Sequence, residues 1–285
     1  MHPWTRPAAH STFAAEAATL LADLRRDVAS NNGRAKTSHF ERRALWTYSW
    51  GPKSPTQGIH KHTLVGDAWS RAKCVWCEQL RERKRELDVE HYRPKVCVTE
   101  WQETPQLIAN EPPQERNERG GYWWLAFAWN NFALSCKTCN QGWKRNLFPV
   151  RASRSADVKE GDETRDAPLL LDPSVPFRVA DHFRWTPGGI IEPVSDQGFA
   201  TIVTCGLNRR DLLERRAQVA QNVLDHRGEL IKALRGDRAD RPEVLRREKR
   251  ALAALGSITA EFTGMVRWLV EEGLKRSWSD LGFDP

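Results

Sequence analysis

Residues 130–146 read NNFALSCKTCNQGWKRN, and this stretch determines the predicted fold together with an earlier Cys-x-x-Cys pair, Cys74 and Cys77. Its own Cys-x-x-Cys pair is Cys136 and Cys139. Each pair places two thiolates within reach of one ion, and two pairs complete the tetrahedral shell that structural zinc prefers. The sequence therefore predicts one structural zinc ion, held by all four of these cysteines and left with no open position for water.

The two pairs lie much farther apart than in a compact zinc ribbon, where about 15 to 20 residues separate them. Residues 104–121 supply part of the excess, because they are polar, rich in Pro, Glu and Asn, and typical of a surface insertion. A redox role for the pairs is the alternative, but two copies without a βαβ pattern disfavour it. Cys97 and Cys205 belong to neither pair and are predicted to be buried as small apolar residues.

Composition limits the class of protein. The chain has 285 residues, enough for one large domain or two smaller ones. Lysine and arginine number 44 against 37 acidic residues, so the net charge of +7 favours polyanionic partners without proving one. The N-terminus lacks the apolar run of a signal peptide, and no stretch reaches the roughly 18 apolar residues of a membrane span. A cytoplasmic protein with no membrane association is expected.

The pattern of apolar residues predicts four regions. Phe13, Ala17 and Leu24 recur at helical spacing near the N-terminus. From Leu207 onward a first helix is expected, with Asn208 and Asp211 as its capping box, and a second helix is expected to run through the apolar positions of 245–269. The predicted regions are an N-terminal helical arm (1–73), a zinc-bound core with the surface insertion (74–150), a linker and mixed accessory segment (151–206) and a C-terminal helical region (207–285).

The segment DVEHYRPK, residues 88–95, places Glu90 beside His91. Hydrolysis of a phosphodiester needs a divalent cation to absorb charge and a base with a pKa near neutrality, and these two side chains supply a ligand and a base. Neighbours in a strand point to opposite faces, so both can serve one site only at a strand end or in a loop. Surface charge is the simpler interpretation of Glu-His alone, but the zinc ligands disfavour it because they bring Asn140 back against this segment.

Lys144 follows Asn140 by four residues. If Asn140 opens a helix, both side chains lie on one helical face and can contact one phosphate. Arg145 is predicted to join them as a forked donor, with Lys144 as a point charge. Tyr122, Trp123 and Trp124 could stack on bases, but packing beside a zinc core is the favoured interpretation.

Together these motifs resemble the HNH, or ββα-metal, nucleases with a zinc-bound core. The shared frame is a Cys-x-x-Cys pair, an acid-His pair, an Asn five residues before the second Cys-x-x-Cys and an Asn directly after it. The resemblance implies an α+β fold: a zinc-bound ββα-metal core with an N-terminal helical arm and a C-terminal helical hairpin. It implies His91 as general base, Glu90 and Asn140 as ligands of a catalytic divalent ion, and Asn131 as the residue that fixes the loop bearing His91. These oxygen ligands favour a hard ion, Mg²⁺ or Mn²⁺.

Finer features are similar to one branch of that family, the PtuB-like HNH effectors of Septu and related retron anti-phage systems. They lie in residues 90–95, 121–126 and 144–149, and the similarity continues downstream through 168–173 and 201–209. This resemblance implies a partner protein, an ABC-type ATPase (PtuA-like) that restrains or delivers the nuclease.

The predicted substrate is a nucleic acid, with DNA favoured over RNA, and Arg93 and Lys95 are predicted to contact it beside Lys144 and Arg145. An alternative from another class is a non-catalytic zinc-containing module that binds nucleic acid or a protein. That alternative accounts for the cysteine pairs and the basic charge, but it leaves Glu90, His91 and Asn140 unexplained at their positions.

Overall fold

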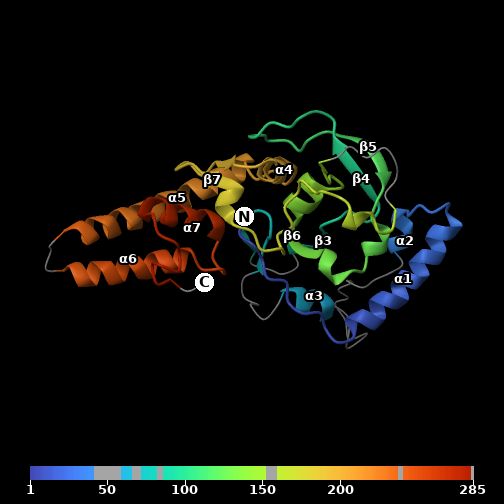
Figure 1. The fold of residues 1–285 in the computed structure, drawn as a ribbon, viewed down its shortest axis with the longest axis horizontal. Helices are drawn as coiled ribbons and strands as arrows, with labels where there is room; N and C mark the ends of the chain where they lie inside the picture. Colours follow the sequence, from blue (N-terminus) through green and yellow to red (C-terminus); the bar gives the residue numbers. More distant parts are fainter. Residues whose placement is uncertain (42–58, 66–71, 82–85, 152–158, 237–239, 284–285) are drawn as a thin grey trace.

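The computed structural model describes residues 1–41, 59–65, 72–81, 86–151, 159–236 and 240–283. The molecule is elongated, with a mixed body between a helix from the N-terminal region at one end and a helical arm from the C-terminal region at the other (Figure 1). Helices and small antiparallel sheets occur in the same chain, as expected for the α+β class. No helix among the described ranges is long and apolar enough to cross a membrane.

The N-terminal region is helical, as the apolar spacing predicts. Its described helices are α1 (Phe13–Ser30), α2 (Thr37–Glu41) and α3 (Ile59–Val65). The buried face of α1 carries Phe13, Ala17, Leu24 and Val28, which are spaced by four or seven residues and pack on the body of the molecule.

Two short hairpins carry the first half of the zinc-binding region. β1 (Ala72–Lys73) pairs with β2 (Leu80–Arg81) around the first cysteine pair. The predicted insertion, residues 104–121, contains a strand: β4 (Cys97–Trp101) pairs antiparallel with β5 (Glu115–Gly120). The middle of β5 is exposed to solvent, so the insertion is a surface hairpin in place of an irregular loop.

The sheet that positions the candidate site joins β3 (Leu87–His91) to β6 (Phe132–Cys136) in antiparallel register. His91 lies opposite Phe132 and Glu90 lies opposite Ala133. Every residue of β6 is buried, in keeping with its nearly continuous apolar sequence. A helical segment, η4 (Thr138–Lys144), follows β6 at once and has π-helical hydrogen bonding. Local π-helical turns recur at functional sites in other proteins.

The remaining elements before the C-terminal arm are short. The helical turns are η2 (Trp123–Leu125), η3 (Trp129–Asn131), η5 (Asp162–Thr164) and η6 (Val179–Asp181). β7 (Phe183–Trp185) pairs with β8 (Ile191–Pro193), and α4 (Asp196–Thr204) follows. The Ser195 hydroxyl accepts a hydrogen bond from the Gly198 amide at 3.0 Å and so caps α4.

The C-terminal region forms three helices, and here the sequence-based prediction was partly wrong. α5 (Arg210–Arg235) and α6 (Arg241–Leu255) pack side by side as a projecting hairpin, but the expected second helix over 245–269 ends at Leu255 and α7 (Thr263–Leu274) begins separately (Figure 1). The break has two causes. Gly256 ends α6 where the Trp278 ring leaves no space for a Cβ, and Phe262 takes a left-handed φ of 53° before α7.

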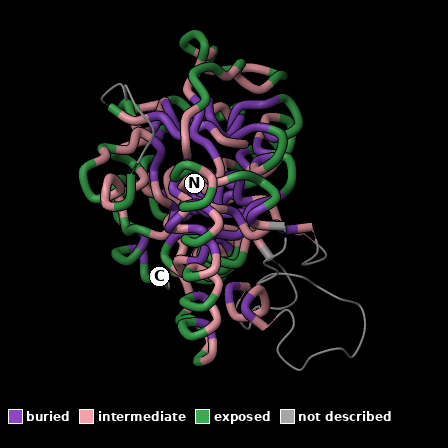
Figure 2. The backbone as a smooth tube through the Cα atoms, turned by 90° about the vertical axis from the view of Figure 1, so that its right-hand side faces the viewer, coloured by how far each residue is buried: buried purple, intermediate pink, exposed green. Residues whose placement is uncertain are grey.

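The predicted capping box at the start of α5 was also wrong. Arg209 is the N-cap residue and its side chain makes no capping hydrogen bond. The Asn208 side chain instead accepts from the Ile191 amide at 2.9 Å and donates to the Ile191 carbonyl at 2.8 Å. Asn208 therefore fastens the start of α5 to β8. Buried backbone runs through the centre of the body, and exposed residues concentrate on its rim (Figure 2).

Candidate functional site

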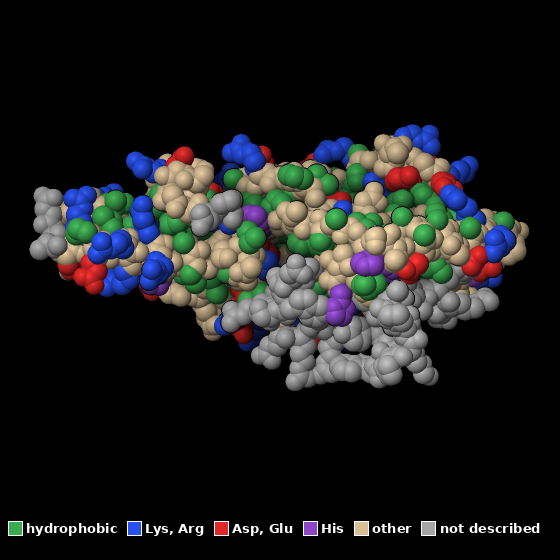
Figure 3. Space-filling model, turned by 90° about the horizontal axis from the view of Figure 1, so that it is seen from below, with side chains coloured by type: hydrophobic (Ala, Val, Ile, Leu, Met, Phe, Trp, Pro, Cys, Tyr) green, Lys and Arg blue, Asp and Glu red, His purple; other side chains and the backbone are tan. Residues whose placement is uncertain are grey.

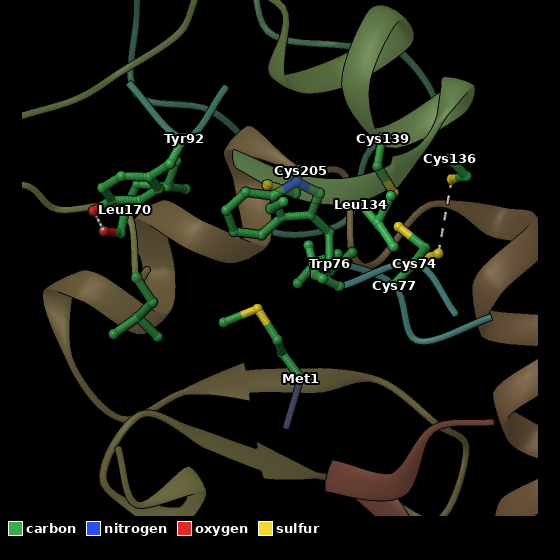
Figure 4. Close-up of a cluster of buried hydrophobic side chains, with 14 of the residues drawn as sticks. Met1, Cys74, Trp76, Cys77, Tyr92, Leu134, Cys136, Cys139, Leu170 and Cys205 are labelled. Atoms are coloured by element: carbon green, nitrogen blue, oxygen red, sulfur yellow. Dashed lines mark hydrogen bonds between the residues drawn. The ribbon is translucent and has the colours of Figure 1, made fainter. Parts of the chain in front are cut away.

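The four cysteines of the predicted zinc site converge. Cys74 and Cys77 lie in the turn between β1 and β2, Cys136 ends β6, and Cys139 lies in η4 (Figure 4). All four are buried, their sulfur atoms lie within 4.8 Å of one another, and the Cys77 and Cys136 Sγ atoms are 3.9 Å apart. Tetrahedral zinc with bonds of about 2.3 Å needs sulfurs roughly 3.8 Å apart. The four cysteines could therefore hold a metal such as zinc.

Electrostatics favours a thiolate at this cluster. Hydrogen bonds from the other cysteines lower the pKa of Cys136, whereas burial raises the pKa of Cys74 and hydrogen bonds with the other cysteines raise that of Cys139. Metal binding requires deprotonated sulfur, and a bound cation would stabilise all four thiolates. Cys97 and Cys205 are buried and stand outside the cluster, which confirms the prediction for both.

Side chains on one face of β3 contact side chains of η4: Asp88 contacts the start of η4, and Glu90 contacts its end. Asp88 and Glu90 are two residues apart on the strand, so they point to the same side. The Asn140 amide donates to Asp88 Oδ2 at 3.3 Å, and the Gln141 amide donates to the same oxygen at 2.7 Å. Lys144 lies opposite Glu90. Thr138 begins the helical segment in place of Asn140, yet Asn140 and Lys144 still address neighbouring positions on the strand.

Glu90 and Lys144 form a buried ion pair. Lys144 Nζ lies 2.5 Å from Glu90 Oε1 and donates to the His91 carbonyl at 3.0 Å, while the two side chains are only 2% and 1% exposed. Burial raises the pKa of Glu90, and the nearby ammonium partly offsets that rise. Lys144 thus joins η4 to the end of β3 through both a side chain and the backbone.

His91 is the last residue of β3, so the predicted placement at a strand end holds. Its Nε2 lies 3.0 Å from the Ala126 carbonyl oxygen, and its ring meets Phe132 edge-on with ring centres 5.1 Å apart. A carbonyl only accepts, so Nε2 carries the proton and Nδ1 keeps its lone pair. Burial and the positive charge of Lys95 lower the pKa of His91 well below its usual value, so the ring is neutral at pH 7.

Asn131 holds the backbone that follows His91. Its Oδ1 accepts from the Arg93 amide at 2.8 Å, and its Nδ2 donates to the carbonyls of Arg93 and Leu125 at 3.1 and 3.2 Å. The Asn131 carbonyl also accepts from the Tyr92 amide at 2.9 Å. One buried side chain therefore ties together the ends of two loops beside the imidazole.

Three of the four cations predicted to contact phosphate are paired internally. Besides Lys144, Arg93 NH1 lies 3.1 Å from Asp166 Oδ2, and Arg145 Nε lies 2.6 Å from Glu115 Oε1. Lys95 is half-buried, and its ammonium lies 5.3 Å from the centre of the Phe40 ring. In this arrangement the three paired side chains stabilise the site through their ion pairs. Any of them could contact a phosphate only after its ion pair with the carboxylate had broken.

The aromatic run beside the zinc-binding region is mainly packing, as predicted. Tyr122 and Trp124 are buried, and the Trp124 indole donates to Glu163 Oε2 at 2.8 Å. The Tyr122 hydroxyl donates to Asp166. Both aromatic residues therefore anchor the segment around η5, and their rings are not presented to a nucleic-acid base.

Sequence reasoning missed three features of this site. The Asp88 carboxylate lies on the same strand face as Glu90, and the spacing of two residues could have identified it. The Ala126 carbonyl that orients His91 gives no sequence signal. Arg209 lies against Cys139 from a segment far along the chain, and only the fold brings them together.

The Glu90–Lys144 pair gives a prediction about stability. We expect Lys144→Met to lower the free energy of unfolding by about 3 kcal/mol, because it leaves a buried carboxylate without its counter-ion. Urea denaturation followed by tryptophan fluorescence measures the change. Lys137→Met, on the exposed side of the same turn, is the matched control and should match wild type. Equal stability of Lys144→Met and wild type would contradict the buried pair.

Comparison with known proteins finds similarity to the Septu protein PtuB of Bacillus mycoides (strain KBAB4). The two sequences are 32% identical over 153 residues, which is 53% of this chain and 48% of that protein. The chain therefore spans about half the length of the curated relative that it matches. No protein-family model and no solved structure match it. The similarity confirms the resemblance to Septu PtuB proteins that the motifs predict.

Proposed function

We propose that this protein is a divalent-metal-dependent nuclease of the HNH type that hydrolyses phosphodiester bonds in nucleic acid. The observation that carries the proposal is the β3–β6–η4 arrangement. It sets a neutral imidazole with a free Nδ1 at the end of a strand, one residue from a carboxylate that faces the helical segment. A module that only binds has no need for an oriented neutral imidazole at this position.

The proposed base is His91 acting through Nδ1. Because the Ala126 carbonyl holds the Nε2 proton, Nδ1 is the nitrogen that can take a proton from an attacking water. The lowered pKa keeps this nitrogen unprotonated at pH 7. Asn131 is a positioning residue in this scheme, since its hydrogen bonds fix the backbone on the C-terminal side of the base.

The chemistry of the donor set suits a hard divalent ion. Asp88 and Glu90 offer carboxylate oxygens and Asn140 offers an amide oxygen, all on one strand–helix face. Mg²⁺ and Mn²⁺ prefer such oxygen ligands. When bound, the ion would stabilise negative charge on the phosphate and on the leaving oxygen. The Lys144 ammonium lies 2.5 Å from Glu90 Oε1 and favours the ionised form of that carboxylate.

Cleavage assays with purified full-length protein test the proposal. Plasmid DNA and a structured RNA are incubated in parallel with increasing Mg²⁺ or Mn²⁺, with and without the candidate partner. Wild type should cleave only with added ion, and Asp88→Ala, Glu90→Ala and Asn140→Ala should each need more ion to reach half-maximal rate. Cleavage unaffected by strong chelation of Mg²⁺ would reject the metal-dependent mechanism. Binding without cleavage under every condition would favour the non-catalytic zinc module.

We further propose that the protein acts as an effector of anti-phage defence together with an ABC-type ATPase. Support comes from the similarity to a Septu protein PtuB over about half of each chain. The projecting hairpin of α5 and α6 offers a surface remote from the candidate site (Figure 1). Co-expression of the full-length protein with the neighbouring ATPase gene should give a complex that co-purifies. If this protein elutes without the ATPase from cells that contain both proteins in soluble form, the proposed partnership is rejected.

The basic surface gives a prediction about salt. Lysine and arginine side chains gather at the end of the molecule formed by α5 and α6, with acidic ones beside them (Figure 3). Because the net charge is only +7, the affinity of the isolated protein for DNA or RNA should be modest and should fall steeply as salt rises. Fluorescence anisotropy with a labelled oligonucleotide between 50 and about 200 mM salt measures this. Affinity independent of salt would contradict a phosphate-based interaction.

A further inference from the structure

Arg209 is buried against the cysteine cluster. Only 4% of the residue is exposed, and NH1 donates to the Gly206 carbonyl at 3.1 Å and lies 3.5 Å from Cys139 Sγ. Nε lies 2.9 Å from Asp211 Oδ1, whose side chain is largely exposed. NH2 is buried and has no hydrogen-bond partner among the described residues. One end of the guanidinium therefore faces the sulfur cluster and not a carboxylate.

A second buried arginine lies nearby with mainly neutral partners. Arg216 donates to the carbonyls of Gly189 and Leu207 and lies 3.5 Å from the Asn208 side-chain oxygen. Burial lowers the pKa of Arg216 to about 10, and negative charge on Cys77, Glu78 and Cys139 would oppose that shift. Two positive charges thus lie within the interior that surrounds the cluster.

These charges match a loaded metal centre. A zinc ion carries two positive charges and four thiolates carry four negative ones, so the centre is an anion in a dry interior. A buried anion of this kind is stabilised by nearby hydrogen-bond donors and cations. Groups that hydrogen-bond to the metal ligands also fix the orientation of those ligands. Arg209 offers both, because its guanidinium is a cation and a hydrogen-bond donor to sulfur.

Close packing holds Arg209 in this place. Gly206, at a left-handed φ of 58°, lies so near the Trp143 ring that a Cβ would come within 2.0 Å of it. Trp143 belongs to η4, which also carries Cys139. The turn from Gly206 to Arg209 is thereby pressed onto the helical segment that supplies the last ligand.

We propose that Arg209 is a positioning residue for the metal centre, where its guanidinium orients the Cys139 thiolate and offsets the negative charge of the loaded site. The C-terminal region would then complete a site whose ligands all lie before residue 140. This inference rests on the proposal that the four cysteines bind zinc.

Zinc retention by the full-length protein tests the inference. Wild type is compared with Arg209→Gln, which keeps a donor but removes the charge, and with Arg209→Lys, which restores the charge. Arg210→Met is the matched control, because the Arg210 side chain is 82% exposed and its Nε lies 3.0 Å from Glu214 Oε1, one helical turn away on the surface. The readouts are zinc content, the rate of zinc release to a chelating dye, and the sulfur-to-metal absorption band after cobalt substitution.

Arg209→Gln should release zinc roughly 10- to 100-fold faster and should shift the cobalt band, the range expected for loss of an outer-sphere partner. Arg209→Lys should recover most of the retention, and Arg210→Met should match wild type. Wild-type protein without zinc would defeat the underlying metal proposal. Zinc-loaded wild type with unchanged release and an unchanged band in Arg209→Gln would overturn the role of Arg209 alone. If Arg209→Gln fails to fold, the Arg209→Lys variant decides the question. A folded Arg209→Lys protein that retains no zinc would overturn the argument that the charge of Arg209 stabilises the site.

Discussion

Replacement of His91 by alanine is expected to lower the cleavage rate by roughly 10² to 10⁴-fold, because general-base catalysis contributes a factor of that size. The fold should survive, since His91 is the last residue of β3 and its ring makes a single hydrogen bond, to the Ala126 carbonyl, and one edge-on contact, with Phe132, among the described residues. Initial rates on DNA and RNA, with saturating Mg²⁺ and the partner present, measure the loss. Zinc content and the thermal transition should stay close to those of wild type.

His182→Ala is the matched control for this variant. His182 is another partly buried histidine, and its ring contacts the Ser195 hydroxyl at 2.7 Å, far along the chain from the candidate site. Its removal should leave the rate within a few-fold of wild type. Full activity of His91→Ala on every substrate that wild type cleaves would reject the HNH mechanism and favour a zinc module that only binds.

Loss of one cysteine ligand is expected to abolish both zinc binding and local structure. Cys136→Ser leaves three sulfurs, and a structural site of this kind contributes on the order of 10 kcal/mol to folding in small zinc domains. We expect the purified variant to contain no zinc and to lose protection from hydrogen exchange over residues 74–149. Cleavage should disappear with it, because Cys136 ends the strand that pairs with β3, which carries Glu90 and His91, and Cys139 lies in η4 beside Asn140.

Cys97→Ala provides the comparison for that experiment. Cys97 is buried but stands outside the cluster, so its truncation should cost about 1 kcal/mol and leave zinc content unchanged. A soluble, native Cys136→Ser protein with full zinc content would show that the cluster is not the metal site.

The sequence was most informative where the signal is local. Two Cys-x-x-Cys pairs predicted the cluster because thiolates at that spacing share an ion. The Glu90–His91 neighbours predicted a strand end or a loop, because the alternation of a strand otherwise separates them, and the structure has the strand end. The helix with Phe13 and Leu24 on one face followed from its apolar period.

Long-range pairing explains what could not be predicted. The sequence did not indicate that Arg93 and Arg145 pair with Asp166 and Glu115, because these carboxylates come from distant parts of the chain. Contact of the two arginines with phosphate stays a prediction. The apolar spacing across Gly256 continued that of a helix, and only the fold shows that α6 ends at this position, where the Trp278 ring leaves no room for a side chain. Local sequence patterns contain no information about which side chain from a distant part of the chain will contact a given residue in the fold.

The contact between Cys139 and Arg209 has a consequence for synthesis of the protein on the ribosome. The first two cysteines emerge early, the second two emerge much later, and Arg209 emerges last of all. Long-range contacts of this kind form only after the intervening chain has been made. A nascent chain that stops before residue 209 would therefore lack the final packing of the cluster. If the protein is the nuclease proposed above, an unfinished polypeptide would not yet have the contact that supports its metal site.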